Sequence, residues 1–291
     1  MKVNMGRSGI VAFALLAMIS MVLGADQKYC QQTNSSLRHY TELGCKPKYK
    51  GHCIEQYDCP FIKNPPSPDK CYLNGYTFNV SDRVPDNLIT NKCMIGCFCG
   101  ENRSEGKAGF ICAIVDCVEA FMTPDPEKIN CIRQYKIGGC CYENEVCDPE
   151  EIAALKTCTW ESKDYKEGEI FDPTGSCKQC ICTKDFDGTI KSPYCMEIGC
   201  GIGIWGDNRA LDNCGPIYYE GEDCCPISWQ CASATDIITS KPVGNCGKPG
   251  PKCHYGDKLL NIGDTVQGGV YCVTCSCDVP PLISCVSKAN C

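Results

Sequence analysis

Residues 93–99 read CMIGCFC and residues 177–182 read CKQCIC, and each stretch belongs to a longer series of ten cysteines. The first series consists of Cys71, Cys93, Cys97, Cys99, Cys112, Cys117, Cys131, the adjacent pair Cys140 and Cys141, and Cys147. The second consists of Cys158, Cys177, Cys180, Cys182, Cys195, Cys200, Cys214, the adjacent pair Cys224 and Cys225, and Cys231. The gaps between successive cysteines are 21, 3, 1, 12, 4, 13, 8, 0 and 5 residues in the first series and 18, 2, 1, 12, 4, 13, 9, 0 and 5 in the second. Such agreement establishes an internal duplication.

Two partial units flank this pair. The C-terminal one repeats the opening gaps of 18, 2 and 1 residues and contains Cys253, Cys272, Cys275, Cys277, Cys285 and Cys291. The N-terminal one resembles a closing half and contains Cys30, Cys45, Cys53 and Cys59, whereas Cys246 fits no unit. We therefore predict partial modules over 26–60 (closing half) and 253–291 (opening half), and complete modules over 71–147 and 158–231.

The composition limits the fold class. The chain has 31 cysteines in 291 residues, and its 43% hydrophobic content includes them. A cysteine content this high is typical of a disulfide scaffold rather than of one large apolar core. We expect a small disulfide-rich fold of mainly short antiparallel β-strands, arranged as an extended string of cystine-stapled modules. With 28 Lys and Arg against 35 Asp and Glu, the chain lacks the basic patch of a nucleic-acid binder.

Residues 1–25 have the features of a secretory signal peptide. Lys2 and Arg7 precede an apolar run over 10–23, and the small residues Gly24 and Ala25 follow. The alternative, a membrane anchor, is disfavoured because 14 residues are too few to span about 30 Å of hydrocarbon. No second apolar run approaches spanning length. We predict a secreted, extracellular protein with no membrane span, in an oxidising compartment where cysteines pair. Because 31 is odd, at least one thiol is left free, capped or bonded to another chain.

The order of the cysteines resembles the von Willebrand factor type C module, the chordin-like cysteine-rich repeat. The likeness covers 71–231 fully and 30–59 and 253–291 in part. The closing Cys-Cys-x5-Cys is longer than the usual two-residue gap and is more similar to single-domain type C proteins of arthropods, some found in venom or saliva.

This resemblance implies a disulfide connectivity. In the first module it implies Cys71–Cys99, Cys93–Cys140, Cys97–Cys112, Cys117–Cys141 and Cys131–Cys147. In the second it implies Cys158–Cys182, Cys177–Cys224, Cys180–Cys195, Cys200–Cys225 and Cys214–Cys231. In the partial units it implies Cys30–Cys53, Cys45–Cys59, Cys253–Cys277 and Cys275–Cys285. Cys246, Cys272 and Cys291 remain as unpaired or intermolecular candidates, of which two can pair with each other.

Local signals predict a few elements. Asn74-Gly75 before the alternating stretch 76–80 predicts a turn between strands, and Asp187-Gly188 marks another turn. Over 148–157 we expect a short helix with Asp148 as N-cap and Pro149 as its first residue.

No catalytic, cofactor or metal site is predicted. His39, His52 and His254 lie in no known catalytic motif, and we expect all three to be exposed to solvent. The Cys-x2-Cys spacings at 177–180 and 272–275 allow a zinc or redox site, but the repeat favours structural cystines. The acidic stretch 185–188 has too few ligands for a calcium loop and is interpreted as a turn.

Surface features indicate modification and binding. Asn34, Asn79 and Asn102 begin N-glycosylation sequons, which predicts a glycoprotein. Aromatic residues near the module starts offer a binding edge, although small local apolar clusters are the favoured alternative. These residues are Tyr72, Tyr76, Trp160 and Phe171, whereas Trp205 and Trp229, in the second half of a module, are candidates for covering cystines.

Two classes of function remain. The first is a non-enzymatic binding protein, and the type C resemblance implies growth factors of the TGF-β/BMP group as its extracellular protein ligands. The second is a cystine-crosslinked matrix, silk, shell, venom or saliva component with disulfide-linked self-association. The odd cysteine and the partial last unit favour the second slightly, and we expect a binding protein overall.

Overall fold

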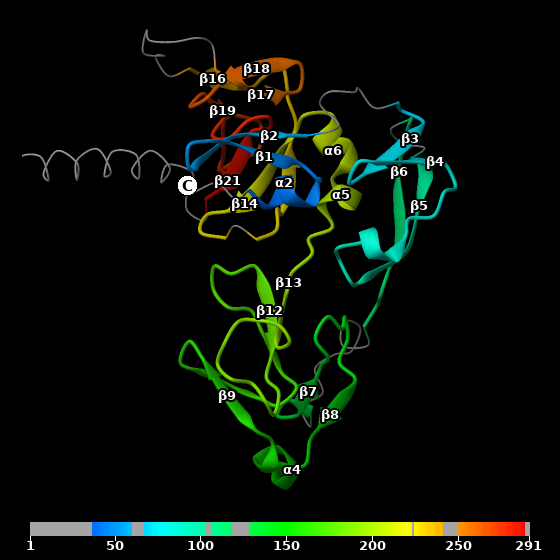
Figure 1. Ribbon diagram of the computed structural model, residues 1–291, viewed down its shortest axis with the longest axis vertical. Helices are drawn as coiled ribbons and strands as arrows, with labels where there is room; N and C mark the ends of the chain where they lie inside the picture. Colours follow the sequence, from blue (N-terminus) through cyan, green and yellow to red (C-terminus); the bar gives the residue numbers. More distant parts are fainter. Residues whose placement is uncertain are drawn as a thin grey trace, which may run out of the picture.

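The computed structural model describes residues 37–59, 67–102, 106–117, 128–222, 224–240 and 250–288. The signal peptide, Cys30, Asn34, Cys246 and Cys291 lie outside these residues. Figure 1 shows a hairpin lobe (67–117) beside a terminal lobe (37–59 and 201–288), with a middle lobe (128–200) below both. Each lobe name refers only to the described residues of its ranges.

The elements of each lobe are short. The hairpin lobe contains β3 (Lys70–Leu73), β4 (Tyr76–Asn79), the 3-10 helix η1 (Asp86–Leu88), β5 (Met94–Asn102) and β6 (Lys107–Ile114). The middle lobe contains β7 (Ile132–Gln134), β8 (Asn144–Val146), α4 (Pro149–Ala154), β9 (Thr157–Trp160), β10 (Lys163–Lys166), β11 (Ile170–Phe171), β12 (Lys178–Ile181) and β13 (Cys195–Glu197). The terminal lobe contains α2 (Arg38–Glu42), β1 (Lys46–Lys50), β2 (Cys53–Asp58), α5 (Ile202–Trp205), α6 (Asp207–Leu211), β14 (Gly215–Tyr219), β15 (Ser228–Gln230), β16 (Ile237–Thr239), β17 (Lys252–Tyr255), β18 (Lys258–Asn261), β19 (Thr265–Gln267), β20 (Val273–Ser276) and β21 (Ser284–Ser287).

Most sheets are two- or three-stranded and antiparallel, so the expected small disulfide-rich β fold is confirmed. One sheet is larger, with the strand order β15-β14-β21-β20-β19-β16. Its β14 and β21 run parallel, with Ile217 opposite Cys285. The sheet therefore joins the closing half of the second module to the C-terminal partial module.

The same turn recurs in all three opening halves. A carboxylate accepts the N–H of the residue three positions before it, at 2.7 Å for Asn79 and Asp82 and at 2.8 Å for Asn261 and Asp264. Glu169 accepts from Lys166 in the same way. The residue just before each carboxylate has a positive φ, and it is Ser81, Gly168 or Gly263. This acidic position is a structural repeat that cysteine spacing does not reveal.

The disulfides within the described residues have the same partners that the type C resemblance implies. In the first module they are Cys71–Cys99, Cys93–Cys140, Cys97–Cys112, Cys117–Cys141 and Cys131–Cys147. In the second they are Cys158–Cys182, Cys177–Cys224, Cys180–Cys195, Cys200–Cys225 and Cys214–Cys231. In the partial units they are Cys45–Cys59, Cys253–Cys277 and Cys275–Cys285.

Cys53 and Cys272 are disulfide-bonded as well. Cys272 is therefore not the odd thiol, although the sequence left it as a candidate. Since every cysteine in the described residues is disulfide-bonded, the odd cysteine is one of the three that lie elsewhere in the chain, Cys30, Cys246 and Cys291.

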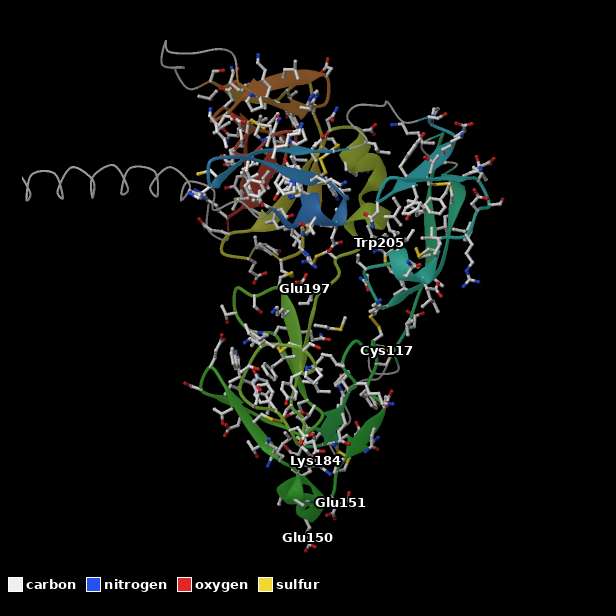
Figure 2. All side chains as sticks on the ribbon, viewed as in Figure 1. Cys117, Glu150, Glu151, Lys184, Glu197 and Trp205 are labelled. Atoms are coloured by element: carbon white, nitrogen blue, oxygen red, sulfur yellow. A yellow bond between two sulfur atoms is a disulfide. The ribbon has the colours of Figure 1, made fainter. Side chains whose placement is uncertain are left out.

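The hairpin lobe and the terminal lobe pack against each other, whereas a string of separate modules was expected. Helix α5 links two of them, because Ile204 is buried with Leu73 in the hairpin lobe and Ile202 is buried with Tyr40 in the N-terminal segment. Arg38 ties the terminal lobe to the middle lobe, since its Nη1 lies 2.8 Å from Glu197 Oε2. Figure 2 shows Glu197 at the edge of the middle lobe that faces the terminal lobe. The few apolar residues that join the lobes come from different modules, so overall composition did not indicate them.

Two local predictions are confirmed. Asn74 and Gly75 both have a positive φ and connect β3 to β4. Asp148 caps α4, because its Oδ1 accepts the N–H of Glu150 at 2.9 Å and that of Glu151 at 3.0 Å.

The expectation for the histidines is wrong for His39, which is buried. Its Nδ1 lies 3.1 Å from the Tyr218 hydroxyl, and its ring packs against Tyr40, with 4.1 Å between centroids. Burial without a counter-charge lowers the pKa of His39 to about 3. The imidazole is therefore neutral and forms part of the core. His52 is exposed and His254 is half-buried.

Candidate protein-binding face

The β5–β6 hairpin contains a β-bulge that decides which residues face outward. Ile95 pairs with Ala113 and Phe98 pairs with Ile111, so β5 has one more residue than β6 in this interval. Gly96 absorbs the extra residue with a φ of 61°. Because of the bulge, Ile95 and Phe98 lie on the same face of the hairpin, although they are three positions apart.

The outer face is apolar. Ile95, Phe98 and Ile111 are 51%, 39% and 46% exposed, and Ala113 is exposed beside them. We call these four residues the hairpin patch. The inner face carries Cys97, Cys99 and Ala108, which are buried against Phe78 and Val84. A hairpin with one buried face normally has a polar outer face, so an apolar outer face needs an explanation beyond folding.

The other opening halves are an internal comparison. Phe98, Ile181 and Ser276 occupy the same position, between the third and fourth cysteine of their units. Ile181 is only 6% exposed, and it pairs with Ile170 of the neighbouring strand β11. In the hairpin lobe the equivalent neighbour makes only an isolated bridge, between Arg83 and Phe98. Only the hairpin lobe therefore presents an apolar side chain to solvent at this position.

Sequence reasoning missed this patch. The sequence feature that could have indicated it is the extra residue in Cys93-x3-Cys97, because the equivalent spacing at 177–180 and 272–275 is Cys-x2-Cys. The extra residue is the bulge, and the sequence FICAI over 110–114 supplies the opposite strand.

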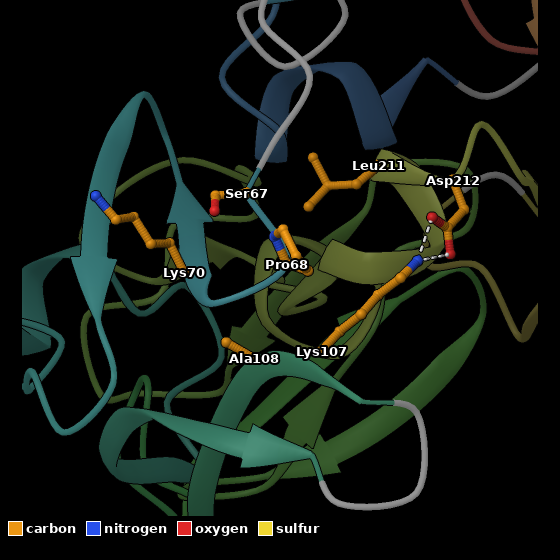
Figure 3. A pocket seen from close by; sticks show the side chains of 7 residues that line it. All are labelled: Ser67, Pro68, Lys70, Lys107, Ala108, Leu211 and Asp212. Atoms are coloured by element: carbon orange, nitrogen blue, oxygen red, sulfur yellow. Dashed lines mark hydrogen bonds and ion pairs between the residues drawn. The ribbon is translucent and has the colours of Figure 1, made fainter.

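A small pocket lies where the hairpin lobe meets α6 (Figure 3). It measures about 170 Å³ and is lined by Ser67, Pro68, Lys70, Lys107, Ala108, Leu211 and Asp212. Lys107 Nζ lies 2.7 Å and 2.9 Å from the two carboxylate oxygens of Asp212. This ion pair forms part of the pocket wall. It links the first residue of β6 to the residue that follows α6, and so it joins the hairpin to the terminal lobe.

The sequence-predicted aromatic residues do not form one edge. Trp160 and Phe171 stack inside the middle lobe, with 6.0 Å between ring centroids, and the local-cluster interpretation holds for both. Tyr72 is half-buried and its hydroxyl accepts the N–H of Ser67, whereas Tyr76 is exposed. Trp205 is exposed and Trp229 is half-buried.

Of the three N-glycosylation sequons, only the one at Asn79 has an asparagine side chain within the described residues. Asn79 is exposed at the end of β4, and its Nδ2 donates to Asp82 Oδ2 at 3.1 Å. The Asn102 backbone ends β5, but its side chain lies outside the described residues. Asn34 lies outside them as well.

Three groups of possible metal ligands occur in the described residues. Two consist of cysteines alone, namely Cys117 with Cys140 and Cys141, and Cys177 with Cys200 and Cys224. The third adds Glu145 to Cys131 and Cys147. All of these sulfurs are in disulfides and lack the thiolate that binds a metal.

Among the described residues, no helix has the length and apolar character needed to cross a membrane. Comparison with family models, with curated proteins and with solved structures finds no match to this chain.

Proposed function

We propose that the protein is a secreted, non-enzymatic modular protein that binds an extracellular protein partner through the hairpin patch. The observation that carries this proposal is the exposed apolar face of Ile95, Phe98 and Ile111 on a hairpin held by disulfides. Rigid apolar side chains on a stapled strand pair lose little conformational entropy on binding, which favours their use in an interface.

The partner class comes from the type C resemblance. It implies growth factors of the TGF-β/BMP group, so the partner we propose is a growth-factor dimer of that group. The signal-like segment 1–25 and the many disulfides support an extracellular location.

The test measures binding of the natively secreted chain to a purified BMP-group dimer by biolayer interferometry. Ile111→Ser should weaken binding by about 10- to 100-fold, because truncating a central interface side chain costs about 1.4–2.8 kcal/mol. Leu259→Ser is the matched control, since Leu259 is 57% exposed on a strand of the terminal lobe. Equal binding by Ile111→Ser and the wild type would contradict a role for the patch, and no binding by the wild type would contradict the growth-factor partner.

A second function, a cystine-crosslinked structural or secretion-product component, is favoured by the odd cysteine. Because all cysteines in the described residues are bonded, the thiol for a crosslink is among Cys30, Cys246 and Cys291. Non-reducing electrophoresis of the secreted protein tests this function. A ladder of covalent oligomers supports it, and a single monomer band contradicts it.

A further inference from the structure

Two sulfur clusters lie where the halves of each module are joined. In the first, Cys93–Cys140 and Cys117–Cys141 connect the hairpin lobe to the middle lobe. In the second, Cys177–Cys224 and Cys200–Cys225 connect the middle lobe to the terminal lobe. We call these clusters the first and second junctions. Figure 2 shows Cys117 at the narrow connection above the middle lobe.

In each junction two separate disulfides come into contact. Cys117 Sγ lies 3.9 Å from Cys140 Sγ, although these two cysteines are not bonded to each other. Cys224 Sγ and Cys225 Sγ, which belong to different disulfides, lie 3.7 Å apart. Among the described residues, only the junctions place three cysteine sulfurs within 4.8 Å of one another. A thiolate formed in one disulfide therefore has a second disulfide within reach.

The junctions are also more accessible than the disulfides of the opening halves. All eight junction cysteines are half-buried. Each opening-half disulfide contains at least one buried cysteine, and Cys71–Cys99, Cys253–Cys277 and Cys275–Cys285 are fully buried. Because thiol–disulfide exchange needs access to sulfur, an external thiol reaches the junctions before these opening-half disulfides.

We propose that the two junctions are thiol–disulfide exchange sites that take a low-molecular-weight thiol such as glutathione and switch between two disulfide isomers. At the first junction the thiolate attacks Cys141 Sγ, forms a mixed disulfide there and releases the Cys117 thiolate. Cys117 then attacks Cys140 Sγ, so that Cys117–Cys140 forms and Cys93–Cys140 breaks. The Cys93 thiolate finally attacks the mixed disulfide, forms Cys93–Cys141 and releases the external thiol. The number of disulfides is unchanged, and no oxidant is consumed.

The exchange changes the connection between lobes. In the two isomers Cys93 and Cys117 exchange their partners, Cys140 and Cys141. These partners are adjacent in the sequence, and successive Cα atoms are about 3.8 Å apart. The opening and closing halves stay covalently joined in both isomers, while their relative placement changes. The second junction has the same adjacent pair, at Cys224 and Cys225, and undergoes the same exchange.

The full-length variant Cys93→Ser isolates one step, because it leaves a thiol at Cys140 beside the Cys117–Cys141 disulfide. Exchange produces Cys117–Cys140 and moves the thiol to Cys141. The disulfide isomers are separated by chromatography in acid, where thiolates are protonated, and each is returned to mildly alkaline pH. Alkylation and tandem mass spectrometry then locate the free thiol. We expect either isomer to regenerate the same mixture labelled at Cys140 and Cys141.

The control variant is Cys131→Ser, which frees Cys147. This cysteine is exposed, but its cluster holds Glu145 in place of a third sulfur, so its label should stay at Cys147 alone. Label at Cys140 alone in the Cys93→Ser variant, or isomers that do not interconvert, overturns the proposal. The variant Cys177→Ser repeats the test at the second junction.

The wild-type protein provides a test of the exchange that needs no substitution. Incubated with a catalytic amount of reduced glutathione, the intact chain should develop a second chromatographic species of unchanged mass. A single unchanged species overturns the proposal even where a serine variant fails to fold.

Discussion

The carboxylate of Glu42 accepts the backbone N–H of Cys200 at 2.8 Å, although the two residues are 158 positions apart in the chain. Its other oxygen accepts the N–H of Ile202 at 3.0 Å and the hydroxyl of Thr90 at 3.2 Å. Glu42 is 5% exposed, so one buried side chain joins the N-terminal segment, the hairpin lobe and the start of α5.

Glu42→Ala should lower the free energy of unfolding by about 3 kcal/mol, because it leaves buried donors without an acceptor. Guanidinium denaturation followed by fluorescence measures the change. Glu222→Ala, at an exposed turn, is the control and should stay within about 0.5 kcal/mol of the wild type. A loss no larger than in this control would show that Glu42 does not hold the lobes together.

Acid should destabilise the terminal lobe through His39. Burial lowers its pKa to about 3 from 6.5, so the neutral ring stabilises the fold fully above pH 6.5. This contribution falls as pH drops from 6.5 towards 3, and about 2 kcal/mol is lost by pH 5. Burial raises the pKa of the neighbouring Tyr40 hydroxyl, so this group stays protonated between pH 5 and 7. Denaturation at pH 7 and pH 5 measures the loss.

The variant His39→Gln tests the assignment of this acid sensitivity. Glutamine keeps a polar side chain but cannot gain a proton in this range, so the difference between pH 7 and pH 5 should shrink by about 2 kcal/mol. An unchanged difference would mean that other groups cause the acid sensitivity.

Gly100→Ala should impair partner binding while the fold persists. A methyl group at Gly100 would overlap the side chain of Ile111, which can move because its end is exposed. We expect unfolding to change by less than about 1 kcal/mol and binding to weaken by roughly 10-fold. Gly250→Ala is the control, since nothing lies within 4 Å of its added methyl. Normal binding by Gly100→Ala would place the interface elsewhere.

Asp148→Ala should destabilise α4 by about 1 kcal/mol, because the N–H groups of Glu150 and Glu151 lose their acceptor. Hydrogen exchange over residues 149–154 measures the loss. Asp148→Ser retains a capping oxygen and should show protection close to that of the wild type. Equal exchange in all three proteins would show that the cap is not needed.

Covalent and local features could be predicted from neighbouring residues. The turn at Asn74-Gly75 and the helix capped by Asp148 depend on groups within a few positions of one another. The disulfide-rich β class can be inferred from cysteine content, and the partners implied by cysteine order are those of the described disulfides. In contrast, the hairpin patch could not be recognised, because it depends on a bulge at Gly96 and on the exposure of the Phe98 side chain.

The sequence by itself therefore determined the repeat, the short strands, the turn, the capped helix and the class of fold. Only the tertiary structure decided that His39 is buried against Tyr218, that β14 pairs with β21 and that α5 joins two lobes. The physical reason is the distance along the chain. Caps and turns satisfy hydrogen bonds within a few residues, whereas burial depends on which distant segment arrives, and His39 meets a partner 179 positions away.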